Sequence, residues 1–196
     1  MYIPIGVDCG VATALRKYGA RQWAFPFDWT VTYNGVSACV ADNFSRFMPV
    51  AADRINEYDV FFMHDFLDGA SDKDKYERRI SRFQDLLATT DEEVVFIRRG
   101  HGNHQHLEHE GRFLDIKSDI VDAGDLAGVL TARYPRLKFK VVVILVCGRC
   151  FSRQQVYKAS SALVEIHNIV SLEADTAAFE ECVGRIVGAG SGAANT

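Results

Sequence analysis

Long apolar runs and glycine-rich nucleotide loops are both missing from this sequence. No stretch of the 196 residues approaches the ~20 consecutive apolar residues that cross a bilayer, so we expect no membrane-spanning helix. Neither G-x-G-x-x-G nor a P-loop is present, so no cofactor is expected. The N-terminus has no basic region before its apolar run and no cleavage pattern, which predicts that there is no signal peptide.

Charge of one sign is not in large excess either. The net charge is −4, which points neither to a nucleic-acid partner nor to an anionic membrane. The five cysteines are odd in number and form no regular framework, which is typical of the reducing cytoplasm, and we expect the protein there. With 48% hydrophobic and 24% charged residues, the chain has the composition of one soluble globular domain.

Predicted strands and helices alternate along the chain. The expected strands are 2–7, 58–63, 93–98, 138–146 and 167–172, and the expected helices are 10–18, 36–47, 73–88, 124–134, about 153–164, and 176–187. The run 138–146 is continuously apolar and β-branched after its first residues, as in a strand that is covered on both faces. We therefore predict a single α/β domain over 1–187, a three-layer open sandwich with a mostly parallel sheet of about five strands. Residues 188–196 are expected to form a disordered tail.

A cysteine lies where the first predicted strand gives way to the first predicted helix. Cys9, between Asp8 and Gly10, would lie at the positive end of the helix dipole and near unpaired backbone N–H groups. Both favour thiolate over thiol. Cysteine nucleophiles are commonly built in this way. The alternative is a small buried hydrophobic residue, and the negative charge of Asp8 works against the thiolate.

Ligands of an open parallel sheet bind at the carboxyl ends of its strands. Cys9 follows the first predicted strand and His64 the second, so an imidazole could take the thiol proton. Asp28 is the preferred group to orient that imidazole, with Asp65 as the alternative. The N–H groups of Cys9 and Gly10 could bind a developing oxyanion. Equally, His64 could be a structural histidine bonded to the backbone.

Four motifs follow one another along the first half of the chain. They are Phe25-Pro-Phe-Asp-Trp29, Phe61-Phe-Met-His-Asp-Phe66, Lys75-Tyr-Glu-Arg-Arg-Ile-Ser-Arg-Phe83 and Val95-Phe-Ile-Arg98. Together with Gly6-x-x-Cys9 they resemble a family of bacterial and viral domains of unknown function that is described as papain-like cysteine peptidases. The resemblance covers roughly residues 3–100. It implies a thiol-dependent hydrolase that acts on a peptide or small-molecule substrate.

Papain itself has its catalytic histidine far downstream, on an antiparallel sheet. Here His64 follows Cys9 by 55 residues, in a sequence with the pattern of a parallel sheet. We therefore expect a scaffold that differs from that of papain.

Arginines and aromatic residues supply candidate substrate contacts. Arg98 and Arg99 could join the arginines of the 75–83 motif (Arg78, Arg79 and Arg82) to form an anion pocket. Such a pocket would take a nucleotide, a sugar nucleotide or another phosphate-bearing ligand, which would suit a transferase. The alternatives are a solvated basic helix face and an Arg98 that is buried against a carboxylate such as Asp28 or Asp65. Trp29 could line a substrate cleft or belong to a hydrophobic wall. The candidate substrate-binding residues are Gly10, Trp29, Asp65, Arg79 and Arg98.

Two groups of potential metal ligands lack a recognised spacing. Four histidines occur within 101–109, but without the helical H-E-x-x-H pattern, so we expect a solvent loop whose histidines are fortuitous. Cys147 and Cys150 form one C-x-x-C pair with no second pair to complete a zinc site. We therefore expect no metal. A binding module without chemistry remains the third functional hypothesis.

Overall fold

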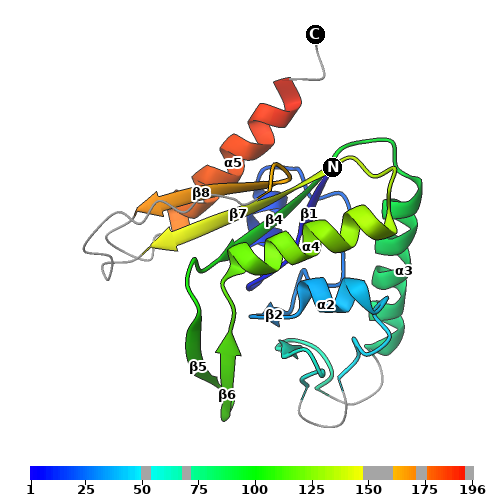
Figure 1. Cartoon of the computed structure of the whole chain (residues 1–196), viewed down its shortest axis with the longest axis vertical. Helices are drawn as coiled ribbons and strands as arrows, with labels where there is room; N and C mark the ends of the chain where they lie inside the picture. Colours follow the sequence, from blue (N-terminus) through cyan, green and yellow to red (C-terminus); the bar gives the residue numbers. More distant parts are fainter. Residues whose placement is uncertain (50–53, 68–71, 148–160, 171–175, 193–196) are drawn as a thin grey trace.

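A computed structural model describes residues 1–49, 54–67, 72–147, 161–170 and 176–192 (Figure 1). The elements are, in chain order, β1 (Tyr2–Pro4), α1 (Gly10–Lys17), β2 (Val31–Thr32), α2 (Val36–Ala41), β3 (Val60–Phe61), α3 (Lys73–Thr89), β4 (Val94–Gly100), β5 (Gln105–His109), β6 (Arg112–Ile116), α4 (Asp119–Arg133), β7 (Phe139–Cys147), β8 (Val164–Val170) and α5 (Thr176–Gly192).

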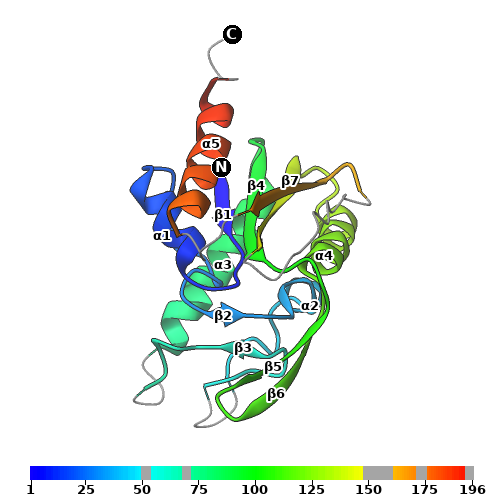
Figure 2. The same cartoon turned by 90° about the vertical axis from the view of Figure 1, so that its left-hand side faces the viewer.

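The main sheet has the order β1-β4-β7-β8, and every neighbouring pair in it is parallel. Figure 2 shows α1 and α5 on one side of this sheet and α4 on the other. The predicted three-layer α/β sandwich is confirmed. Within the described residues its sheet has four strands rather than five, because the expected strand at 58–63 contributes only β3. That strand pairs with β2 in a separate antiparallel sheet.

Side chains of the central strands point alternately to the two faces of the main sheet, which explains why helices cover both faces. Val94 and Phe96 of β4 join the larger apolar cluster, which includes residues of α2, α3 and α4. Val95 and Ile97 point the other way and pack with residues of α1 and α5. Successive side chains of a strand point to opposite faces, so a continuous apolar run supplies two cores at once.

A hairpin that the sequence prediction missed follows β4. β5 and β6 pair antiparallel, with Leu107 opposite Leu114. Glu110 and Gly111 connect them with φ values of 50° and 74°, as in the two-residue turn whose twist matches that of the flanking strands. The expected loop of fortuitous histidines is therefore a β-hairpin, and Figure 1 shows it extending away from the main sheet.

Several element boundaries also differ from the prediction. α4 begins at Asp119, where the side chain of Ser118 accepts a hydrogen bond from the N–H of Ile120 as an N-cap. Residues 153–160 of the expected helix at about 153–164 lie outside the described residues, and β8 begins at Val164. α5 runs through Gly192, so residues 188–192 are helical and not part of a disordered tail. Across the described residues, no helix is both long and apolar enough to cross a membrane.

Candidate functional site

Cys9 is the residue immediately before α1, where the chain leaves the carboxyl end of β1. Backbone pairing with β4 continues past β1, because the N–H of Val7 donates to the carbonyl of Arg99 at 3.2 Å. The carboxylate of Asp8 accepts the Gly10 N–H at 2.7 Å and lies 3.6 Å from the Arg99 guanidinium. Arg99 therefore offsets the negative charge beside Cys9, and the Gly10 N–H, a candidate oxyanion donor, already has an acceptor.

The three cysteines whose side chains are described are all free thiols but differ in exposure. Cys9 is partly exposed, whereas Cys39 and Cys182 are buried. Burial raises the pKa of Cys39 well above its ordinary value and also raises the pKa of Cys182. Both buried thiols are therefore poor nucleophiles at neutral pH, since the thiolate is the reactive form. Cys150 lies outside the described residues.

His64 follows β3 and is exposed to solvent. Because β3 belongs to the small antiparallel sheet, the expectation that His64 follows a strand of the main parallel sheet is wrong. Within the described part of the chain, no hydrogen bond joins the His64 side chain to Cys9 or to Asp28. The role of His64 as general base stays a prediction.

A second histidine lies directly after a central strand of the parallel sheet. β4 extends to Gly100, two residues beyond the expected end, so His101 is the first residue after it. The N–H of Val7, two residues before Cys9, donates to the carbonyl of Arg99, two residues before His101. Cys9 and His101 therefore follow two neighbouring segments at the carboxyl edge of the sheet. A longer strand prediction through Gly100 would have identified His101 from the sequence.

Asp28 is fully buried and forms an ion pair with Arg21. Nε and Nη2 of Arg21 donate to its Oδ2 at 3.0 and 2.5 Å, and the Arg21 guanidinium lies 5.7 Å from the Trp29 ring centre. The other oxygen, Oδ1, is buried and has no hydrogen-bond partner among the described residues; the same holds for Nη1 of Arg79. Burial raises the pKa of Asp28, and the hydrogen bond from Arg21 counteracts part of the rise. The trio Arg21, Asp28 and Trp29 thus forms one packed group.

Replacement of Asp28 by Asn should change how stability depends on pH. The folded-state pKa of Asp28 lies above its ordinary value of 3.8, so the folded chain holds the proton more tightly than the unfolded chain. The stability that Asp28 contributes is present below pH ~4 and is lost as the pH rises through the folded-state pKa. In urea unfolding from pH 3 to 7, the stability of wild type minus that of Asp28→Asn should therefore fall with rising pH. A difference that rises with pH would contradict the raised pKa.

Asp65 is bound by two residues from the start of α3. The Tyr76 hydroxyl donates to it at 2.7 Å and the Lys75 ammonium at 2.5 Å. Burial and the hydrogen bond to Asp65 raise the pKa of Tyr76. The Arg79 guanidinium lies 5.0 Å from the centre of the Tyr76 ring. Asp65 therefore holds α3 against the segment after β3, and both of its oxygens have partners.

Arg98 is fully buried and joins four segments of the chain. Nη1 donates to the Ile5 carbonyl at 2.7 Å, and Nη2 donates to the carbonyls of Thr32 and Tyr33 at 2.9 and 3.0 Å. Nε donates to the buried carboxylate of Asp119, which also accepts the N–H of His101. Arg98 thus matches the alternative expectation of a buried, carboxylate-paired arginine, although the carboxylate is neither Asp28 nor Asp65. Its donors are engaged, so it does not line an anion pocket.

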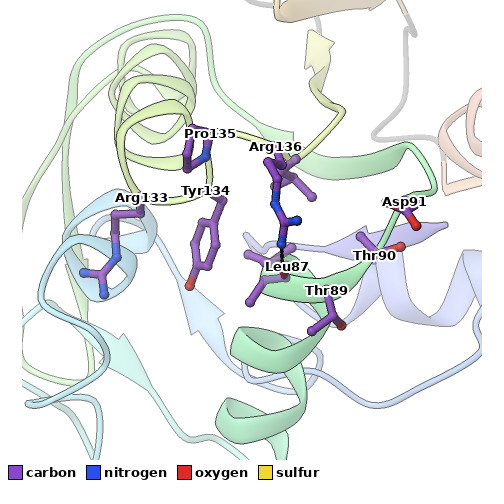
Figure 3. A pocket seen from close by; sticks show the side chains of 10 residues that line it. Leu87, Thr89, Thr90, Asp91, Arg133, Tyr134, Pro135 and Arg136 are labelled. Carbon is purple, nitrogen blue, oxygen red and sulfur yellow. Dashed lines mark hydrogen bonds between the residues drawn. The ribbon is translucent and has the colours of Figure 1, made fainter.

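A cavity of about 380 Å³ lies at the opposite end of the sheet, between the ends of α3 and α4 (Figure 3). Arg133 donates to the Ala41 carbonyl at 2.7 Å, and Arg136 donates to the Ala88 carbonyl at 3.5 Å. These carbonyls lie in the last turns of α2 and α3, where the helix dipole favours cations. The two arginines therefore stabilise helix ends, and the cavity lies away from the edge that carries Cys9.

The family model described as "Putative papain-like cysteine peptidase (DUF1796)" matches residues 1–55 and 54–148. The chain belongs to this family. The match includes Cys9, Asp28, His64 and Arg98. Membership in this peptidase-like family suggests a thiol hydrolase that acts on a peptide or another small molecule.

A viral protein is similar over part of the chain. "Uncharacterized protein R408" of Acanthamoeba polyphaga mimivirus is 27% identical in an alignment that covers 50% of this chain and 60% of the viral protein. The chain thus spans less than two thirds of the length of this relative. No solved structure is significantly similar. The family assignment therefore rests on the sequence motifs and not on a known fold.

Proposed function

We propose that this protein is a thiol-dependent hydrolase or acyl-transfer enzyme whose nucleophile is Cys9. The observation that carries the proposal is the contrast among the described thiols: Cys9 is partly exposed before α1, while Cys39 and Cys182 are buried. Family membership supports the same reaction class. The reducing cytoplasm stays part of this proposal, since the thiol must remain free.

The proposed reaction proceeds through a thioester. The Cys9 sulfur attacks the carbonyl carbon of an amide or ester, and a histidine that has accepted the thiol proton returns it to the leaving group. Water then attacks the thioester and releases the acid, which regenerates the thiol. An acceptor amine or alcohol in place of water would make the same site an acyltransferase.

Two histidines are candidates for the base. His64, with Asp28 as its orienting group, is the assignment from the sequence. Oδ1 of Asp28 has no partner among the described residues, so it could accept an imidazole N–H. His101 is the second candidate, because β4 ends beside the segment that carries Cys9. Each assignment predicts which single histidine substitution lowers the rate at which the Cys9 thiol reacts.

The transferase alternative has lost its main support. Arg98 is buried and bound to Asp119 and to three backbone carbonyls. Arg79 lies against the Tyr76 ring. Neither Arg98 nor Arg79 therefore supports the proposed phosphate site. A binding module without chemistry is the remaining competitor, and thiol reactivity separates it from the hydrolase.

Alkylation at neutral pH tests the proposal. With limiting iodoacetamide and peptide mapping, Cys9 should be labelled before Cys39 and Cys182, because the thiolate must be both formed and accessible. His64→Ala or His101→Ala should slow the labelling of Cys9, and the slower variant identifies the base. His167→Ala, on β8, is the matched control and should leave the rate unchanged. If Cys9 reacts only after denaturation, the nucleophile assignment fails.

A further inference from the structure

The outward face of the β5–β6 hairpin gathers two imidazoles and a carboxylate. His106 on β5 stands directly opposite Asp115 on β6. His104 precedes His106 by two residues and therefore shares its face of the strand. The other face of the hairpin carries Leu114 and Ile116, which pack on the core. The three polar side chains are thus held together by the pairing of two strands.

The ligand atoms of these three side chains are already close. Nε2 of His104 is in contact with Oδ1 of Asp115, and Nδ1 of His106 lies 3.8 Å from the same oxygen. One ligand atom from each residue lies within 4.8 Å of the other two. The two imidazole rings are 5.0 Å apart and perpendicular. Two ligands of a tetrahedral ion at ~2.0–2.1 Å would be about 3.3 Å apart, so only small side-chain rotations are needed.

We propose that His104, His106 and Asp115 form a binding site for a divalent zinc-class cation. Two neutral imidazoles and one carboxylate are ligands that Zn²⁺ prefers, whereas Mg²⁺ and Ca²⁺ take oxygen ligands. Three protein ligands leave one tetrahedral position for water or a substrate group. All three side chains are exposed, so binding removes little protein surface from water. The site could not be predicted from the sequence, because its ligands lie on the two arms of a hairpin and not in one spaced motif.

The site occupies the open end of the hairpin. His104 lies just before β5, which starts at Gln105, and Asp115 lies one residue before the end of β6. The chain enters the hairpin from β4 and returns from it to α4. A bound cation would therefore tie the two connections together. We expect it to raise the thermal stability of the chain by mass action.

Titration of the full chain with ZnCl₂ tests the proposal. Isothermal titration calorimetry should show that one Zn²⁺ binds per chain. The melting temperature should rise with the concentration of Zn²⁺, and it should rise much less with the same concentrations of Mg²⁺. His104→Ala, His106→Ala and Asp115→Asn should each weaken binding by about tenfold or more. These side chains are exposed, so the variants should remain folded. His167→Ala removes another surface histidine, which pairs with Glu165, and should bind as wild type does.

Co²⁺ identifies the ligand type independently. Imidazole and carboxylate ligands should give a spectrum without the intense near-ultraviolet band of thiolate coordination, both in wild type and in the Cys147→Ser/Cys150→Ser variant. A thiolate band in wild type that is absent from that variant would show that Co²⁺ binds to the C-x-x-C pair, which would overturn the proposal. So would the absence of Zn²⁺ binding, or equal binding by the wild type and the three hairpin variants.

Discussion

Arg98→Ala is expected to lower the free energy of unfolding by about 3–5 kcal/mol, the cost of leaving a buried charge without its partner. The variant would leave the carboxylate of Asp119 buried without its guanidinium, and the carbonyls of Ile5 and Thr32 without this donor. Each of these acceptors would lose its hydrogen bond in an environment that excludes water. Urea unfolding followed by circular dichroism measures the loss.

A conservative substitution of Arg98 should not restore the lost stability. Arg98→Lys keeps the charge, but a single ammonium group cannot reach the carboxylate and the separate carbonyls at once. Arg99→Ala is the matched control: it is the next residue of β4, it is partly exposed, and its contact with Asp8 is 3.6 Å long. It should cost about 1 kcal/mol or less. Equal losses for Arg98→Ala and Arg99→Ala would show that the buried network does not anchor the fold.

The parallel core could be predicted because its pattern is local. β7 is apolar and β-branched along most of its length, and such a run fits only a strand that is covered on both faces. Helices α1 and α3 were likewise predicted to within about a residue at each end, since each has an apolar stripe of helical period. These signals lie within a single element and need no knowledge of what packs against it.

The pairing partners could not be predicted in the same way. The pattern around Val60 predicts a strand, but it does not indicate whether that strand pairs with β2 or with the main sheet. The hairpin was missed because its histidines suggested a solvent loop, although Gly111 between two alternating segments was the available signal. These differences in strand placement also affect which residues are expected at the carboxyl edge of the main sheet. His64 was expected at the carboxyl edge of the main sheet, but β3 is not a strand of that sheet. His101 was not considered at this edge because the predicted strand stopped at residue 98, whereas β4 runs to Gly100.

The Arg98 network also explains why a glycine occupies position 6. Gly6 has a φ of +97°, and a Cβ built on it would lie 2.7 Å from Nη1 of Arg98 and 3.2 Å from the Cβ of Thr32. Gly6→Ala should therefore destabilise the fold twice, through a backbone conformation that L-residues avoid and through collision with a guanidinium that is fixed by its own hydrogen bonds. We expect a loss of about 2–5 kcal/mol in urea unfolding.

Gly19→Ala separates these two effects. Gly19 also has a positive φ, of +66°, but a Cβ there would meet nothing within 4 Å, so its substitution should cost only the backbone term of about 1–2 kcal/mol. The excess loss in Gly6→Ala is then the collision. In an Arg98→Met background, which keeps an apolar stem but no guanidinium, that excess should shrink, because the two substitutions act on one contact. If Gly6→Ala costs no more than Gly19→Ala, or if its cost is the same with and without the guanidinium, Arg98 does not dictate the glycine at position 6.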